Sequence, residues 1–183
     1  MRTRRENRGR NAAAANRVAL IGAAREQFAS EGFDASLSAI ARQAGVGQGS
    51  LYRHFPDRVS LALAVFDDNV TALEALAATP ASTLDDLLAL ITEQTAASVA
   101  FIDMLHASDE DPRLRDVVGR VRDLLDGKLR AARHDGRIRP TVTADDLLLA
   151  VRMVAGLLAK SVPGERAELA DRAWAMLRPA ITG

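Results

Sequence analysis

Residues 36–55 read SLSAIARQAGVGQGSLYRHF, and this stretch decides the fold. Its first half predicts a short helix with one apolar face, because small and aliphatic residues recur at i, i+3, i+4 and i+7. These residues are Leu37, Ile40, Ala41 and Ala44. Gly45 ends this helix, and a second short helix runs from about Gln48 until Pro56 stops it. Two short helices joined by a glycine-containing turn are typical of a helix-turn-helix.

The second of these helices has one apolar side and one polar side. Leu51 and Phe55 lie one turn apart and are expected to pack inward. The opposite side is then free to enter the major groove of DNA. Glutamine suits adenine edges, tyrosine and histidine suit backbone phosphates, and glycines let the backbone N–H groups approach closely. The candidate DNA-binding residues here are Gly47, Gln48, Gly49, Ser50, Tyr52 and His54.

Arg58 lies just beyond this segment, in the first turn of the next helix. A cation at that position opposes the helix dipole, which is mildly unfavourable. A DNA phosphate nearby would reverse the sign of that interaction. Arg58 is therefore a further candidate contact, with ordinary surface charge as the alternative.

The rest of the chain predicts an all-α fold of eight to ten helices without a strand. Ser82 with Asp85, and Thr143 with Asp146, resemble capping boxes at helix starts. The remaining helices are expected at about 12–30, 58–78, 83–106 (divided in two if it bends near 94–98), 111–134, 143–161 and 165–177.

Charge is unevenly distributed although the formal net charge is zero. Residues 1–58 hold ten arginines against five acidic residues, and the remainder is correspondingly acidic. A basic N-terminal segment attached to an acidic remainder favours a polyanionic partner for residues 1–58. We expect a disordered basic arm at 1–10, a DNA-binding domain at 11–58 and a helical effector-binding and dimerisation domain at 59–183.

The composition also excludes several kinds of chemistry. There is no cysteine, so disulfides and zinc–cysteine sites are ruled out. The three histidines are far apart without metal-ligand spacing, and no glycine-rich phosphate loop follows a strand. We therefore expect no catalytic residue, no metal and no cofactor. No apolar run approaches the roughly 18–20 residues that a membrane span needs, and the basic start lacks the apolar segment of a secretory signal, so a cytoplasmic protein is expected.

The pattern around the predicted helix-turn-helix resembles the N-terminal domain of TetR-type transcriptional regulators over about residues 14–66. The residues that carry the resemblance are Phe28, Gly32-Phe33, Ile40-Ala41, Ala44-Gly45-Val46, Gly49 to Pro56, Arg58 and Leu61. The resemblance implies a homodimer that binds operator DNA, usually represses, and releases DNA when a small-molecule effector enters the C-terminal domain. It also implies DNA contacts at Ser36 and Gln43 in addition to those named above. The segment from Gly32 to Ile40 is one residue shorter than the common family spacing, which leaves the cap position open between Ser36 and Ser38.

The C-terminal two-thirds carries no comparable motif. By resemblance, the last two long helices form the dimer interface, with an intramolecular core as the alternative. The candidate interface residues are Leu147, Val151, Val154, Leu158, Trp174 and Leu177. The effector pocket is expected among the middle helices, although Met and Phe at helical spacing often form plain core. Its candidate lining is Phe66, Phe101, Met104, His106 and Met153.

Two other functions compete with this interpretation. An enzyme would need a catalytic constellation, and none has a recognisable signature here. A helical ligand- or partner-binding protein without DNA binding would not need the polar face between Gln48 and His54. That face favours a DNA-binding regulator over both alternatives.

Overall fold

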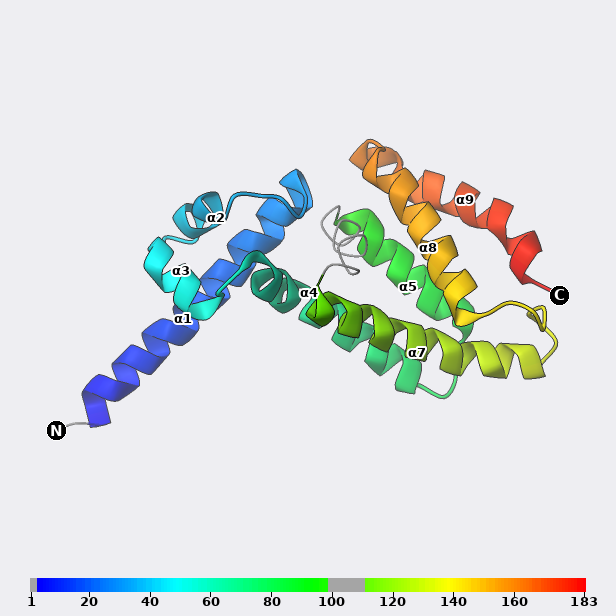
Figure 1. Cartoon of the computed structure of the whole chain (residues 1–183), viewed down its shortest axis with the longest axis horizontal. Coiled ribbons are helices and arrows are strands. Elements are labelled where there is room, and N and C mark those ends of the chain that lie inside the picture. Colours follow the sequence, from blue (N-terminus) through cyan, green and yellow to red (C-terminus); the bar gives the residue numbers. More distant parts are fainter. Residues whose placement is uncertain (1–2, 99–110) are drawn as a thin grey trace.

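The computed structural model describes residues 3–98 and 111–183, with side chains described from Ala12 onward. Within these ranges the chain forms eight α-helices and no strand, which confirms the all-α fold. Figure 1 shows two lobes joined through α4. The helices are α1 (Thr3–Glu31), α2 (Leu37–Gln43), α3 (Gln48–His54), α4 (Arg58–Ala78), α5 (Leu84–Ala97), α7 (Pro112–His134), α8 (Ala144–Ala159) and α9 (Arg166–Ile181), with a 3₁₀ turn at Pro163–Glu165.

The N-terminal lobe is a three-helix unit in which α2 and α3 pack on α1. Phe28 of α1, Ile40 of α2 and Leu51 of α3 are almost completely buried together with Phe55. The turn between α2 and α3 needs a glycine at position 45, because φ there is +66°. The predicted pair of short helices is thus confirmed, and their apolar faces form the core of this lobe.

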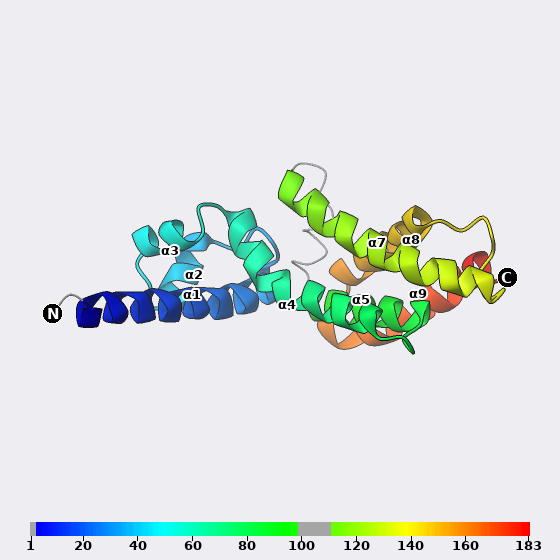
Figure 2. The same cartoon turned by 90° about the horizontal axis from the view of Figure 1, so that it is seen from below.

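The long first helix corrects one expectation. Residues 1–10 were expected to be a disordered arm, yet α1 begins at Thr3 and continues unbroken to Glu31. In Figure 2 its N-terminal part extends past α2 and α3. Apolar periodicity is needed to bury a helix, but arginine, glutamate and alanine are good helix formers in an exposed extension. Extending an existing helix also avoids the cost of a new nucleus.

Side-chain caps fix where several helices begin. Asp57 accepts from the backbone N–H of Ser60 at 2.7 Å and starts α4. The capping box at Thr143 and Asp146 is confirmed at the start of α8. The box predicted at Ser82 and Asp85 is wrong by one residue, since Thr83 and Asp86 form it. Ser82 instead donates its hydroxyl to carbonyls at the end of α4.

The C-terminal lobe is built around α5, α7 and α8, with α4 and α9 packed against them. Its core consists mainly of leucine and valine, including Leu73, Leu87 and Leu125. None of the helices described is both long and apolar enough to cross a bilayer.

The stripe of α8 that was expected at a dimer interface lies inside the subunit. Leu147, Val151, Val154 and Leu158 are all buried within this one chain, so the prediction is wrong for these four residues. Helical periodicity identifies a buried face but does not tell whether the same chain or a second copy covers it. Here α5, α7 and α9 cover it.

Candidate nucleic-acid interface

The third helix presents its polar side to solvent. Leu51 and Phe55 anchor α3 to the lobe, whereas Gln48, Gly49 and Tyr52 are exposed. Tyr52 keeps 51% of its surface accessible, which is high for an aromatic residue. The outward-facing orientation expected for α3 is therefore confirmed, and these side chains are available to a partner.

Hydrogen bonds tie α3 and α2 into one surface. Ser36 is the N-cap of α2, its hydroxyl accepting from the N–H of Ala39 at 3.4 Å. Ser38 instead accepts from Nε2 of Gln48 at 2.7 Å. The cap position left open between Ser36 and Ser38 thus belongs to Ser36. The bond to Ser38 orients the Gln48 amide while leaving its side chain exposed.

Gln43 belongs to a network that connects α2 with α1. Its Oε1 accepts from Gln27 at 2.7 Å, and its Nε2 donates to Oε2 of Glu26 at 2.6 Å. Both ends of the amide are therefore engaged within the chain. Gln43 is exposed but already committed to holding α2 on α1, which makes it a weaker candidate for DNA contact than the residues of α3.

Arg58 has a role different from the predicted phosphate contact. Its Nη1 donates to the carbonyl oxygens of Phe33 and Ala35 at 2.6 and 2.7 Å. The guanidinium also lies 5.9 Å from the Phe33 ring centroid. These carbonyls, rather than DNA, offset the unfavourable position of a cation at the start of α4. Arg58 ties α4 to the loop between α1 and α2, which makes it a weaker candidate for DNA contact than the residues of α3.

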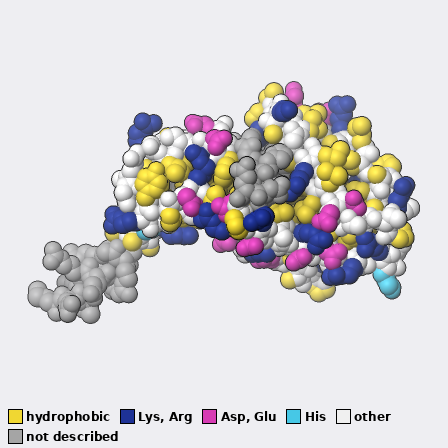
Figure 3. All heavy atoms as spheres, in the orientation of Figure 1, with side chains coloured by type: hydrophobic (Ala, Val, Ile, Leu, Met, Phe, Trp, Pro, Cys, Tyr) yellow, Lys and Arg dark blue, Asp and Glu magenta, His cyan; other side chains and the backbone are white. Residues whose placement is uncertain are grey.

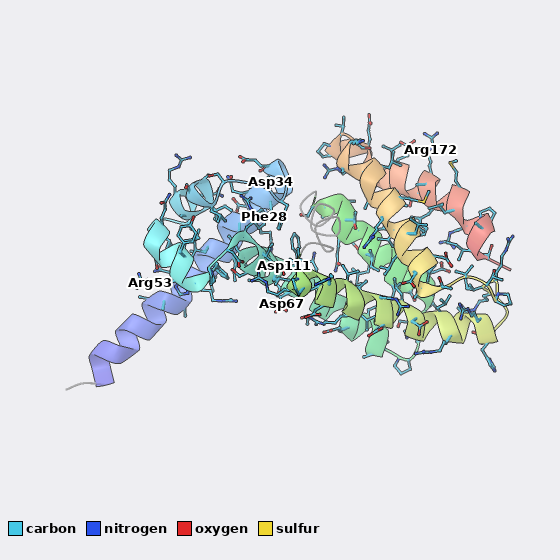
Figure 4. The ribbon with its side chains drawn as sticks, viewed as in Figure 1. Phe28, Asp34, Arg53, Asp67, Asp111 and Arg172 are labelled. Atoms are coloured by element: carbon cyan, nitrogen blue, oxygen red, sulfur yellow. The ribbon has the colours of Figure 1, made fainter. Side chains whose placement is uncertain are left out.

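Two arginines at the same surface were missed by sequence reasoning. Arg53 is exposed in the last turn of α3, with its Nε donating to the Gly49 carbonyl at 3.2 Å. Figure 4 shows it at the edge of the N-terminal lobe, away from the C-terminal lobe. Arg17 of α1 places its guanidinium 5.3 Å from the ring centroid of Phe55. The available signal for Arg53 was its position between Tyr52 and His54 in the motif itself.

Neither backbone conformation nor steric space within the chain requires glycine at the start of α3. Gly47 and Gly49 have ordinary φ values, and a Cβ built on either would meet no atom within 4 Å. Alanine would therefore fit both positions. At Gly49, inside the first turn, it would favour the helix, whereas Gly47 is the N-cap, a position that prefers glycine to alanine. Glycine at an exposed helix start is instead suited to close approach of another molecule's backbone.

His54 and Ser50 are half-buried at the sides of α3. The imidazole of His54 lies 6.3 Å from the Phe55 ring centroid at an interplanar angle of 48°. Both residues can still reach a partner laid along α3, but they also fill space against the lobe. They contribute the flanks of the surface, whereas Gln48, Gly49 and Tyr52 form its centre.

An ion pair connects this lobe to the C-terminal lobe. Arg113, near the start of α7, bridges Asp57 and Asp111 at 3.0 and 2.9 Å. The hydrogen bonds from Arg113 hold the pKa of the Asp57 carboxyl below its usual range, with a further contribution from the backbone of Ser60. Asp57 thus serves both as the cap of α4 and as its link to α7. Asp111 lies near the junction of the lobes in Figure 4.

Phe66 lines a cavity at the junction of α1, α4 and α5, of about 290 Å³. Its place in an effector pocket stays a prediction. Gln94 and Asn69 also line the cavity. Nε2 of Gln94 donates to the Asn69 carbonyl at 3.1 Å, and its buried Oε1 has no hydrogen-bond partner among the described residues. Met153 is not part of it, because it is 56% exposed on the outer side of α8. The other candidates, Phe101, Met104 and His106, lie outside the described residues.

The outer side of α8 and α9 carries exposed apolar residues. Leu149, Met153 and Leu157 follow one another along α8, and Met176 of α9 is 82% exposed. Trp174 and Leu177, expected at a dimer interface, are instead partly buried against this chain's own helices. Figure 3 shows basic and acidic side chains interspersed on the C-terminal lobe, with groups of hydrophobic side chains exposed between them.

Among the described residues, no group of His, Asp or Glu side chains is arranged to hold a metal ion. The arrangement that remains is a helix-turn-helix with an exposed polar helix, attached to a helical lobe that contains cavities. Such an arrangement can bind a double helix and a small molecule.

Comparisons with known proteins agree with this geometry. Residues 20–65 match the family of bacterial regulatory proteins, tetR family. No curated protein sequence matches the chain. Among solved structures, a TetR transcriptional regulator from Streptomyces coelicolor is 28% identical, with a TM-score of 0.60 over 91% of this chain and 98% of that one.

Two further structures share the fold at lower identity. A gamma-butyrolactone receptor is 23% identical, with a TM-score of 0.63 over 93% of this chain and 90% of that chain. The ketosteroid transcriptional regulator KstR2 of Mycobacterium tuberculosis is 20% identical, with a TM-score of 0.61 over 91% of this chain and 95% of that one.

The fold and the exposed third helix define a helix-turn-helix, DNA-binding transcriptional regulator. Within that class, residues 20–65 carry the DNA-binding domain of the tetR family, and the chain as a whole is similar to a solved TetR transcriptional regulator.

Proposed function

We propose that this regulator represses transcription as a homodimer and leaves its operator when a small molecule binds in the C-terminal lobe. The observation that carries the proposal is the exposed polar face of α3, with Gln48, Gly49 and Tyr52 outward while Leu51 and Phe55 are buried. A helix of this kind lies in the major groove, where side chains near its start reach base edges.

The contacts are divided by chemistry. Gln48 reads a base, because its amide suits adenine. Tyr52 and Arg53 hold phosphates, with Ser50, His54 and the backbone at Gly47 and Gly49 closing the flanks. Ser36 caps α2 and offers a further phosphate contact at its edge. Gln43 positions α2 through Glu26 and Gln27.

The second copy of the chain is placed on the outer side of α8 and α9. Leu149, Met153 and Leu157 would leave water when covered by their equivalents, which supplies the driving force for association. Gly156 lies on the same helix, and a Cβ there would meet no atom within 4 Å. A glycine inside a helix weakens it, so its use here is explained by close approach of a partner helix.

The effector site is placed in the cavity lined by Phe66. The cavity touches α1 of the DNA-binding lobe through Arg25 and Ala29, and α5 of the C-terminal lobe through Gln94. A ligand that donates a hydrogen bond to Oε1 of Gln94 would satisfy a buried acceptor. A ligand that fits between α1 and α5 only when they separate would favour a state with a different spacing of the two α3 helices.

A mobility-shift assay with DNA upstream of the chain's own reading frame tests the function. We expect a specific shift at nanomolar protein, and an affinity that falls steeply with salt because phosphate contacts release counterions. Tyr52→Phe should weaken binding to all sequences, whereas Gln48→Ala should change the preferred sequence more than the affinity. Absence of any specific duplex in a selection from random DNA would favour the alternative, a helical ligand- or partner-binding protein.

A further inference from the structure

The helices α5 and α9 run antiparallel and enclose a groove. Asp85 pairs with Arg178 at 3.1 Å at one end, and the Ala96 carbonyl accepts from Arg166 at 3.1 Å at the other. The groove between them has a volume of about 690 Å³. This volume lies within the range typical of small-molecule sites. The groove is separate from the Phe66 cavity, which lies on the side of α5 that faces α1 and α4.

The lining of the groove is mainly apolar and already ordered. Leu88, Ala170 and the ring of Trp174 contribute to it. Nε1 of Trp174 donates to the hydroxyl of Thr92 at 2.8 Å, and that hydroxyl donates to the Leu88 carbonyl at 2.7 Å. The indole is therefore held in place without a ligand, which reduces the entropy lost on binding.

The charges at the groove do not cancel. Arg178 is paired with Asp85. Arg137 is paired with Asp135 at 2.6 Å. Two further carboxylates line the groove, Glu93 and Asp171, and neither has an ion pair or hydrogen bond with any described residue.

These two carboxylates line the same groove as Trp174, one from each helix. Glu93 follows Thr92, the residue bonded to the indole, and Asp171 lies about one turn before Trp174 on α9. A groove that holds an aromatic ring and two carboxylates without a charged partner among the described residues is a favourable environment for an organic cation. An organic anion would meet the same carboxylates and be repelled.

We propose that the groove is a second small-molecule site, and that its ligand is an amphipathic organic cation. The hydrocarbon part lies on Leu88 and Ala170, and the cationic head lies between Glu93 and Asp171 beside Trp174. This site is distinct from the proposed effector cavity. Met176 follows Trp174 by two residues and points about 200° away around α9, so a dimer formed through Met176 leaves the groove open.

The single tryptophan of the chain makes the site measurable. The full-length protein is titrated, without DNA, with octyltrimethylammonium, octanol and octanoate, which share a hydrocarbon chain and differ in charge. We expect a saturable change in Trp174 fluorescence with the cation, and at least tenfold weaker binding of octanoate. Equal affinity for the cation and the anion, or no saturable change with the cation, overturns the proposal.

Variants locate the cation within the groove. Asp171→Asn should weaken octyltrimethylammonium about fivefold, and the double variant with Glu93→Gln about tenfold or more. Glu168→Gln, also exposed on α9 but not lining the groove, is the matched control and should bind normally. Glu93 also borders the Phe66 cavity, whereas Asp171 lines only the groove. Asp171→Asn therefore shows which of these two sites binds the cation. Unchanged cation affinity in Asp171→Asn, or a loss that follows Phe66→Ala instead, overturns the assignment.

Discussion

Arg53 and Arg58 are both arginines near the helix-turn-helix, and their surroundings give them different roles. Arg58 donates hydrogen bonds from its guanidinium to the carbonyls of Phe33 and Ala35. Arg53 is exposed on α3 and makes one bond to the backbone of its own helix. In the sequence the two residues look equally suited to phosphate, and only their neighbours in space separate them.

Replacing Arg58 with methionine should lower the free energy of unfolding by about 1–3 kcal/mol, because two part-buried carbonyls lose their donor. The slope of log affinity against log salt should stay unchanged, since no phosphate contact is lost. Urea denaturation and DNA titration across salt measure the two effects. Arg53→Met is the matched control, with stability within about 0.5 kcal/mol and a salt slope reduced by about one. If Arg58→Met reduced the slope of log affinity against log salt without lowering stability, Arg58 would contact a phosphate after all.

Gly49→Ala separates folding from DNA binding. Alanine fits the space at Gly49 and should raise the unfolding free energy by up to about 1 kcal/mol. The added methyl group would face the DNA backbone, so we expect affinity for the operator to fall about tenfold or more. Gly127→Ala, at an exposed position of α7 with equally open surroundings, should stabilise without affecting DNA binding. Normal affinity in Gly49→Ala would mean that the backbone of α3 does not closely approach DNA.

At the scale of elements, the start of α4 joins the two lobes. Asp57 caps α4, and Arg113 of α7 binds the same carboxylate. The cap was foreseeable from sequence, since an aspartate stands just before an apolar periodic run. Arg113 was not foreseeable, because it is distant in sequence and only packing brings α7 to this position.

The Asp57 carboxyl should make stability depend on acid pH. Its pKa in the folded protein lies below the ordinary value of 3.8, mainly because of the hydrogen bonds from Arg113. The stabilisation is therefore fully present above the ordinary pKa and is lost as pH falls through the folded pKa. Urea midpoints measured from about pH 6 down to pH 3 should fall less steeply in Asp57→Asn than in the unmodified chain. Asp67→Asn, which replaces an exposed carboxylate on α4, is the control. If it reduced the pH dependence of the urea midpoint equally, Asp57 would not be the cause.

At the scale of the whole molecule, the proposed homodimer can bind a two-fold operator only if its two copies of α3 are correctly spaced. The outer side of α8 and α9 is the candidate surface, and Arg172 of α9 projects from the C-terminal lobe in Figure 4. The stripe expected from sequence lies instead in the subunit's own core.

Met153→Glu places a charge in the centre of the proposed interface. We expect the dimer to dissociate at micromolar protein, because a buried unpaired charge is costly, while the fold is retained since Met153 is 56% exposed in the subunit. Sedimentation velocity measures the change, and circular dichroism checks the fold. Val18→Glu on α1, also at an exposed apolar residue, should leave the oligomeric state unchanged. A dimer that survives Met153→Glu would place the interface elsewhere.

The sequence by itself determined the all-α fold, the short helices α2 and α3, the ends of most helices, and which side of α3 faces outward. These depend on local patterns, namely periodicity, glycine turns, proline stops and side-chain caps, which act within a few residues. Only the tertiary structure decided that Arg58 binds carbonyls, that its own chain covers the α8 stripe, and that Trp174 lines a groove between α5 and α9. The α8 stripe consists of Leu147, Val151, Val154 and Leu158. Such partners are distant in sequence, and periodicity shows that a face is covered without showing what covers it.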